Sequence, residues 1–159
     1  MGPTVAYISH TNLSHNIKLI RDAIGPRKIM AVVKANAYGH GDLEVSRTAL
    51  EAGCEYLGVA FLEEGIKLRQ AGISQPVLLF GAYDSGYLAS AIDNNLEVTI
   101  ISEKQIIDLQ NYYTSNHKIP VHLKVDTGMN RLGFQFEKFK KIFLNILPLG
   151  QPLHMTFQN

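Results

Sequence analysis

The chain has 159 residues, of which 46% are hydrophobic and 18% charged, so a disordered or purely solvating polypeptide is excluded. Fifteen Lys and Arg nearly balance 14 Asp and Glu, and no basic run occurs, which argues against nucleic acid or an anionic membrane as the main partner. A single cysteine, Cys54, cannot form an intrachain disulfide, which favours a reducing compartment. No apolar stretch is long enough to span a bilayer and no leader-like segment follows Met1, so we expect a cytoplasmic domain.

Short β-branched or aromatic runs alternate with longer segments that have apolar residues at helical spacing. The N-cap candidates are Thr11 or Asn12, Asp42 and Ser102. In chain order we expect strand Thr4–Ser9, helix Asn12–Ile24, strand Lys28–Lys34, helix Asp42–Ala52, strand Tyr56–Phe61, helix Leu62–Ala71, strand Pro76–Phe80, helix Ser85–Asn94, strand Glu97–Ile101, helix Glu103–Ser115, strand Pro120–Asp126 and helix Phe136–Ile146.

Strands that alternate with helices predict an α/β fold with a parallel sheet covered on both faces. One solution is an open doubly wound sheet, and the other is a (β/α)8 TIM barrel, which needs about 250 residues. The chain holds about five of the eight strand–helix units, and the tail Pro148–Asn159 loses the pattern, without a closing helix. We therefore expect a barrel to be truncated, with unpaired strand edges that make the chain poorly behaved on its own.

The segment AVVKANAYGHG, residues 31–41, carries the most chemical information. Lys34 ends an apolar strand, where burying an unpaired ammonium is costly, and Schiff-base lysines occupy such settings. Tyr38 follows with a hydroxyl on an apolar ring, and Gly39 and Gly41 allow close backbone approach to a ligand. A lysine that simply reaches solvent is the alternative, but the Asn, Tyr, Gly and His neighbours favour function.

A second segment, HLKVDTGMNRLG, covers residues 122–133. Strand alternation puts Lys124 and Asp126 on one face, and Arg131 follows the turn. An arginine fork suits a phenolate, carboxylate or phosphate. The alternative is an ion pair of Asp126 with Arg131 or Lys124 that only ties down a loop.

These two segments resemble known signatures. AVVKANAYGHG looks like the pyridoxal-phosphate lysine signature of alanine racemases, and LKVDTGMNRLGF looks like their second signature. The order and separation agree, so the resemblance extends from about Tyr7 to Phe134. It implies that residues 1–159 are the N-terminal portion of the cofactor-binding barrel. Later strands and a C-terminal β-rich domain would be absent.

The resemblance also implies roles for single residues. Lys34 matches the lysine that holds the cofactor covalently and acts as base on the Cα proton of D-alanine. Tyr38 matches the tyrosine that contacts the cofactor phosphate. Arg131 matches the arginine that binds the cofactor ring hydroxyl near the substrate carboxylate, and Lys124 matches a lysine that is carbamylated in some members. Asn130 stands where many relatives have glycine, which is tolerable because Asn enters the left-handed region readily.

The implied activity is interconversion of L- and D-alanine by a homodimer, which supplies D-alanine to peptidoglycan. The opposite-face base in the family is a tyrosine of the β-rich domain, which these residues lack. His154 is too close in sequence to match the histidine that stacks on the cofactor ring, and no histidine pair has metal-ligand spacing. Two alternatives stay open: a truncated, non-catalytic remnant that at most binds pyridoxal phosphate, or a related racemase acting on another amino acid such as serine.

Overall fold

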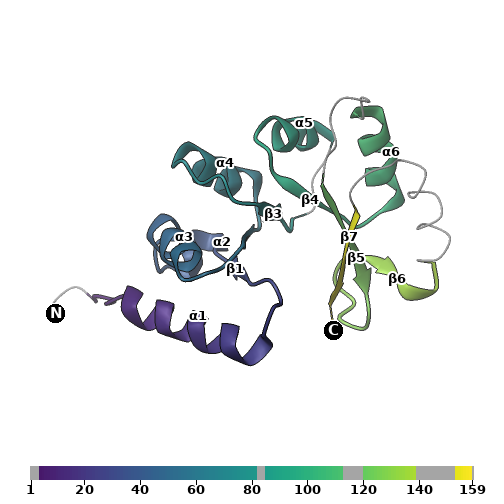
Figure 1. Cartoon of the computed structure of the whole chain (residues 1–159). Helices are drawn as coiled ribbons and strands as arrows, with labels where there is room; N and C mark the ends of the chain where they lie inside the picture. Colours follow the sequence, from purple (N-terminus) through teal and green to yellow (C-terminus); the bar gives the residue numbers. More distant parts are fainter. Residues whose placement is uncertain (1–3, 82–84, 113–119, 139–152, 159) are drawn as a thin grey trace. The chain divides into compact units, whose positions relative to one another are not determined.

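Helices and parallel strands alternate in the computed structural model, which describes residues 4–81, 85–112, 120–138 and 153–158 (Figure 1). The chain divides into two compact units, Met1–Val77 and Leu78–Asn159, which are described separately. Among the described helices, none has the length and apolar character needed to cross a membrane.

The first unit combines two parallel strands with helices that cover them. β1 pairs with β2, with Ala31 opposite Leu57. Ile17, Ala49 and Cys54 are buried together, and α1 packs on α3 around them. The elements are α1 (His10–Ile24), β1 (Met30–Val32), α2 (Lys34–Tyr38), α3 (Asp42–Glu51), β2 (Tyr56–Val59) and α4 (Leu62–Gln70).

In the second unit, strands again alternate with helices, and the unit begins with the last two residues of β3 (Val77–Leu79). β3 pairs in parallel with β4, β4 pairs with β5, and β5 also pairs in parallel with β6 and β7. Its other elements are α5 (Ser85–Asp93), β4 (Glu97–Ile100), α6 (Glu103–Tyr112), β5 (Val121–Asp126), β6 (Phe134–Gln135) and β7 (Leu153–Gln158).

The strands of the second unit are buried, as parallel strands covered by helices must be. Every residue of β4 is buried, and Val121, Leu123 and Val125 of β5 are at most 1% exposed. Leu88 of α5 and Leu109 of α6 supply apolar cover. Burying each such side chain contributes about 1.5–3 kcal/mol, so these contacts hold β5, which carries the second signature.

The five strands expected between residues 28 and 126 all form, each one to four residues shorter than its apolar run. The parallel pairs β1–β2, β3–β4 and β4–β5 are each joined through at least one helix, which confirms the α/β prediction. Ser102 begins α6 as predicted, because its Oγ accepts the Gln105 N–H at 3.3 Å.

Four expectations at the ends of elements are wrong. Residues 4–9 form no strand, and Val5 and Tyr7 are 60% and 94% exposed, so that apolar run is not packed against the residues that the structure describes. The N-cap of α1 is Ser9 in place of Thr11 or Asn12, since the Ser9 Oγ accepts the Asn12 N–H at 3.2 Å.

Asp42 is likewise the first residue of α3, and Gly41 occupies the N-cap position. The tail Pro148–Asn159 contains a strand, β7, whose backbone pairs with β5 over its whole length. The helix expected at Phe136–Ile146 is present at 136–138, and its remainder lies outside the described residues.

Candidate active site

The turn that carries Lys34 has an unusual backbone. β1 ends at Val32, so Lys34 begins α2 and does not lie on the strand, which corrects the sequence prediction. Ala35, Asn36, Ala37 and Tyr38 have φ angles of 51°, 55°, 50° and 55°. These residues therefore form a left-handed helical turn, which costs L-amino acids about 1–2 kcal/mol per residue. Such strain persists only where surrounding contacts hold it.

Backbone hydrogen bonds close this left-handed turn from its C-terminal side. The Gly39 N–H donates to the carbonyl oxygens of Ala35 and Asn36 at 3.1 and 3.0 Å, and the Gly41 N–H donates to Asn36 at 3.0 Å. Gly39 and Gly41 have φ angles of 88° and 90°, so the exit from the turn needs glycine at both positions. The glycines thus serve the backbone path, and the close approach to a ligand expected from the sequence stays a prediction.

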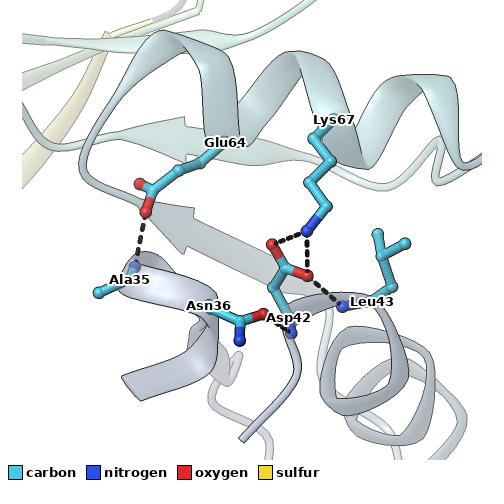
Figure 2. Close-up of polar contacts among 6 residues, drawn as sticks. All are labelled: Ala35, Asn36, Asp42, Leu43, Glu64 and Lys67. Carbon is cyan, nitrogen blue, oxygen red and sulfur yellow. Dashed lines mark hydrogen bonds and ion pairs between the residues drawn. The ribbon is translucent and has the colours of Figure 1, made fainter. Parts of the chain in front are cut away.

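A carboxylate from α4 holds the beginning of the turn. Glu64 Oε1 accepts the Ala35 N–H at 2.5 Å (Figure 2). The other oxygen, Oε2, accepts the N–H groups of Ala60 and Phe61 at 2.8 and 3.0 Å. One side chain therefore joins the residue after Lys34 to the chain between β2 and α4.

A second set of polar contacts holds the other end of the turn. Asn36 Oδ1 accepts the Asp42 N–H at 3.1 Å, and Lys67 Nζ lies 2.7 and 2.8 Å from the two carboxylate oxygens of Asp42 (Figure 2). The Asp42 side chain is 10% exposed and that of Lys67 is 50% exposed. Asp42 also accepts the N–H of Leu43, so its buried carboxylate is well satisfied.

The amine and the phenol of the first signature lie together. Lys34 is half-buried, and its Nζ lies 5.8 Å from the ring centroid of Tyr38, within the range of a cation–π contact. Tyr38 is 60% exposed. The turn thus presents a primary amine beside an accessible phenol.

The second signature surrounds the carboxyl end of β5. Lys124 and Asp126 are half-buried on the same side of the strand, while the intervening Val125 is fully buried. Burial lowers the pKa of Lys124, and the nearby positive charge of Arg131 lowers it further against the opposing effect of Asp126. Arg131 is exposed, so the strand end brings two cations close to one carboxylate.

Asp126 shapes the turn that follows β5. Its Oδ1 accepts the N–H groups of Gly128 and Asn130, each at 3.0 Å, and these bonds lower the pKa of the carboxyl group, the Gly128 bond first. Asn130 has a φ of 56°, which lies in the left-handed region that asparagine enters more readily than most residues. A hollow of about 580 Å³, lined partly by Asp126, Thr127 and Gln135, opens beside this turn.

Gly133 marks a close approach of the chain to β5. At its φ of 119°, an added Cβ would lie 2.7 Å from the backbone oxygen of Lys124 and 3.1 Å from the Asp126 nitrogen. Only glycine fits there without a shift of backbone. This contact returns the chain from Arg131 to the side of β5, where β6 pairs with it.

The structure therefore brings Lys34 to Tyr38 in the first unit, and Lys124 to Asp126 and Arg131 in the second. His154 lies in β7, and its side chain is outside the described residues. Sequence reasoning missed the roles of Glu64 and Lys67. Glu64 stands at N3 of α4, where a carboxylate reaches back to the N-cap N–H, but its bond to Ala35 spans 29 residues and leaves no local signal.

A family profile and the curated relatives of this chain name the same family. The family profile "Alanine racemase, N-terminal domain" matches residues 8–156. Alanine racemase from Nostoc sp. is 47% identical over 131 residues, which cover 79% of this chain and 34% of that protein. The chain spans about a third of the length of the curated relatives it matches.

Solved structures agree with this similarity. The alanine racemase of Acinetobacter baumannii superposes with a TM-score of 0.87 at 30% identity, covering 95% of this chain and 43% of that one. A histidine racemase from Leuconostoc mesenteroides superposes with a TM-score of 0.84 at 30% identity, covering 94% and 41%. These likenesses confirm the predicted truncated barrel as the fold class.

Proposed function

Because this chain belongs to the alanine racemase family, we propose that it is the N-terminal, cofactor-binding part of a pyridoxal-phosphate-dependent alanine racemase. The activity proposed for the whole protein is interconversion of L- and D-alanine. The observation that carries the proposal is the half-buried Lys34 amine beside the Tyr38 phenol on a turn whose strained backbone is held by distant side chains. Strain maintained at this cost is typical of functional sites.

The residues of this turn fit the cofactor's chemistry. A primary amine is the group that an aldehyde condenses with, and Lys34 offers one 5.8 Å from an exposed phenol ring. Lys34 would hold the cofactor covalently through Nζ, and the Tyr38 hydroxyl would donate to its phosphate. When bound, pyridoxal phosphate supplies the electron-withdrawing ring that makes the Cα proton of an attached amino acid removable.

Lys34 has a second proposed task. With the substrate amino acid bound, the neutral Lys34 amine would accept the Cα proton from one face of that carbon. Racemisation needs a second base on the opposite face, which we assign to a tyrosine of the β-rich domain, as the resemblance implies. In this proposal the complete site forms in a homodimer of the longer protein.

Arg131 and Lys124, in the second unit, have proposed roles of their own. The exposed Arg131 guanidinium would donate to the cofactor ring hydroxyl and attract the substrate carboxylate. Lys124 would orient it after carbamylation, since a modified, anionic side chain pairs with arginine where an ammonium repels it. The lowered pKa of Lys124 supports this, because carbamylation requires the neutral amine.

A second candidate differs only in substrate. The histidine racemase from Leuconostoc mesenteroides, with its TM-score of 0.84, has the same fold over this region, so the fold does not select alanine. The same reaction on another amino acid, including serine, is therefore the alternative to the alanine activity. With alanine as substrate, we place the enzyme in the cytoplasm, supplying D-alanine to peptidoglycan.

The experiment that tests the proposal is site mapping of cofactor attachment. Purified protein mixed with pyridoxal phosphate should gain an absorbance band at about 420 nm, which is typical of a lysine-bound pyridoxal. Borohydride reduction and peptide mapping should then place the label on Lys34. Lys34→Arg should abolish the band, whereas Lys28→Arg, a nearby control, should keep it. Labelling that favours another lysine would reject the proposal.

Turnover is measured separately, with the gene's full reading frame expressed beside the 159-residue chain. Alanine, serine and histidine are each offered to the longer protein with added cofactor. Faster racemisation of alanine supports the first candidate, and faster racemisation of another amino acid supports the second. Cofactor attachment at Lys34 without turnover of any of them would identify a remnant that only binds pyridoxal phosphate.

A further inference from the structure

Glu64 contacts the peptide that directly follows the proposed cofactor lysine. Its Oε1 accepts the Ala35 N–H at 2.5 Å, and Ala35 is the first residue of the left-handed turn. A hydrogen bond to a carboxylate is stronger than one between neutral groups. This bond therefore fixes the plane of the peptide that joins Lys34 to Ala35, and with it the direction in which Lys34 leaves the backbone.

The other oxygen of Glu64 makes the bond to Ala35 rigid. Oε2 accepts the N–H groups of Ala60 and Phe61 at 2.8 and 3.0 Å, so the carboxylate is held on both sides. Glu64 is half-buried, and the first turn of α4 fixes its stem. A side chain held in this way cannot follow the turn if the turn relaxes toward right-handed backbone.

The Asp42–Lys67 pair supports the same turn from its far end. Lys67 lies one turn beyond Glu64 on α4, and it holds Asp42, whose N–H donates to Asn36 Oδ1 at 3.1 Å (Figure 2). One face of α4 thus contacts the left-handed turn directly at Ala35 and indirectly at Asn36.

We propose that Glu64 is a positioning residue that holds the left-handed turn so that Lys34 presents its amine to the cofactor. The cofactor part of this statement rests on the proposed function, whereas the hold on the turn does not. A purely local role is the rival explanation, in which Glu64 serves only to cap α4 through the Phe61 N–H.

Two variants and one double variant separate these explanations. Glu64→Gln keeps the size, but its NH2 group cannot accept a hydrogen bond. The amide oxygen keeps more bonds by facing the two N–H groups of Ala60 and Phe61, which turns the NH2 group toward the Ala35 N–H and removes that bond. Glu63→Gln is the matched control, since Glu63 is exposed and lies in the same first turn with the same charge. Glu64→Gln combined with Ala35→Gly tests rescue, because glycine enters left-handed backbone without the penalty that alanine incurs.

The readouts are amide hydrogen exchange at Ala35 and the rate of borohydride-trapped pyridoxal labelling at Lys34. For Glu64→Gln we expect exchange at Ala35 to rise at least tenfold and labelling at Lys34 to fall at least fivefold. Glu63→Gln should stay within twofold of the unaltered chain in both. The double variant should recover at least half of the lost labelling, which a role confined to capping α4 would not produce.

Several outcomes would overturn the proposal. Glu64→Gln with unchanged exchange at Ala35 would show that the carboxylate does not hold the turn, and absence of rescue by Ala35→Gly would favour the capping role. If Glu64→Gln does not fold, as judged by circular dichroism, the unaltered chain decides: an Ala35 amide that exchanges as fast as an unstructured one rejects the proposal. If the unaltered chain takes no label at Lys34, the proposed function fails, and exchange at Ala35 still tests the hold on the turn.

Discussion

The turn after β1 and the turn after β5 hold their signature residues in opposite ways. In the first, four non-glycine residues from Ala35 to Tyr38 adopt left-handed backbone, and Glu64, 29 residues away, secures them. In the second, Asp126 secures its own loop through bonds to Gly128 and Asn130, two and four residues away. Within this loop, Gly128 and Gly133 have the largest positive φ angles, 135° and 119°.

The two turns should therefore be vulnerable at different places. A turn held by distant side chains should fail when the supporting helix is altered, even if its own residues are intact. A turn held by its own carboxylate and glycines should fail when those residues change and should tolerate changes elsewhere.

The largest effect is expected from Gly133→Ala. Its Cβ would meet the Lys124 backbone oxygen at 2.7 Å in a backbone region that favours glycine. We expect the free energy of unfolding to fall by about 3 kcal/mol, measured by urea denaturation. Gly128→Ala is the control, since its φ is also positive but nothing lies within 4 Å of the added Cβ, and it should cost about 1 kcal/mol. Equal losses would show that the close approach does not matter.

A smaller loss is expected from Lys67→Met. Removing the ammonium leaves the nearly buried Asp42 carboxylate without its ion pair, and the half-exposed position of Lys67 limits the cost to about 1 kcal/mol. Lys104→Met breaks an exposed pair with Asp108 and should cost about 0.3 kcal/mol. Thermal denaturation of both variants measures the difference. If Lys104→Met costs as much, the support from α4 is weaker than its geometry implies.

The turn after β5 should respond to acid through Asp126. Backbone bonds, the one from Gly128 first, lower the pKa of its carboxyl group below the ordinary aspartate value of about 3.9. The stabilisation is therefore present above that value and is lost as the pH falls through the lower, folded pKa. A pH titration of the Gly128 amide resonance should show a midpoint below about 3.9. Asp126→Asn should remove this transition, and a midpoint at or above the ordinary value would contradict the bonds.

The smallest expected effect is on the chemical reactivity of the Lys124 amine, and the free energy of unfolding should stay unchanged. Burial, and then the charge of Arg131, lower its pKa below the ordinary lysine value of about 10.4. Its amine should therefore acylate with a midpoint below that value in the folded chain, and the midpoint should rise in urea. Arg131→Gln should move the folded midpoint upward by removing a like charge. Mass spectrometry of peptides acylated across a pH series measures each midpoint.

Much of the fold could be predicted because its signals are local. Buried strands such as β4 are short apolar runs, and the beginning of α6 is marked by Ser102, whose side chain satisfies an orphan backbone N–H. The errors concern segments whose structure depends on whether they pair with another strand. Residues 4–9 have the pattern of a strand but no described partner, whereas β7 follows prolines in the sequence and still pairs with β5.

The residues proposed for the site were found from the sequence, but the contacts that support them were not. Lys34, Tyr38 and Arg131 were identified because a strand end, glycines and a family signature surround them. Glu64 stands in the first turn of a helix, where a carboxylate needs no further role, and nothing near it in sequence points to Ala35. Left-handed backbone at two alanines also has no local signal, since alanine favours the right-handed helix.

The wide spacing between Ala35 and Glu64 has a consequence for biogenesis. On the ribosome, the segment around Lys34 emerges before the helix that supports it has been synthesised. Until α4 docks, alanine and asparagine prefer ordinary backbone angles, so the lysine has no defined direction. We expect vitamin B6 capture to follow the docking of α4, so that a nascent polypeptide ending before Glu64 would discriminate poorly between this lysine and any other.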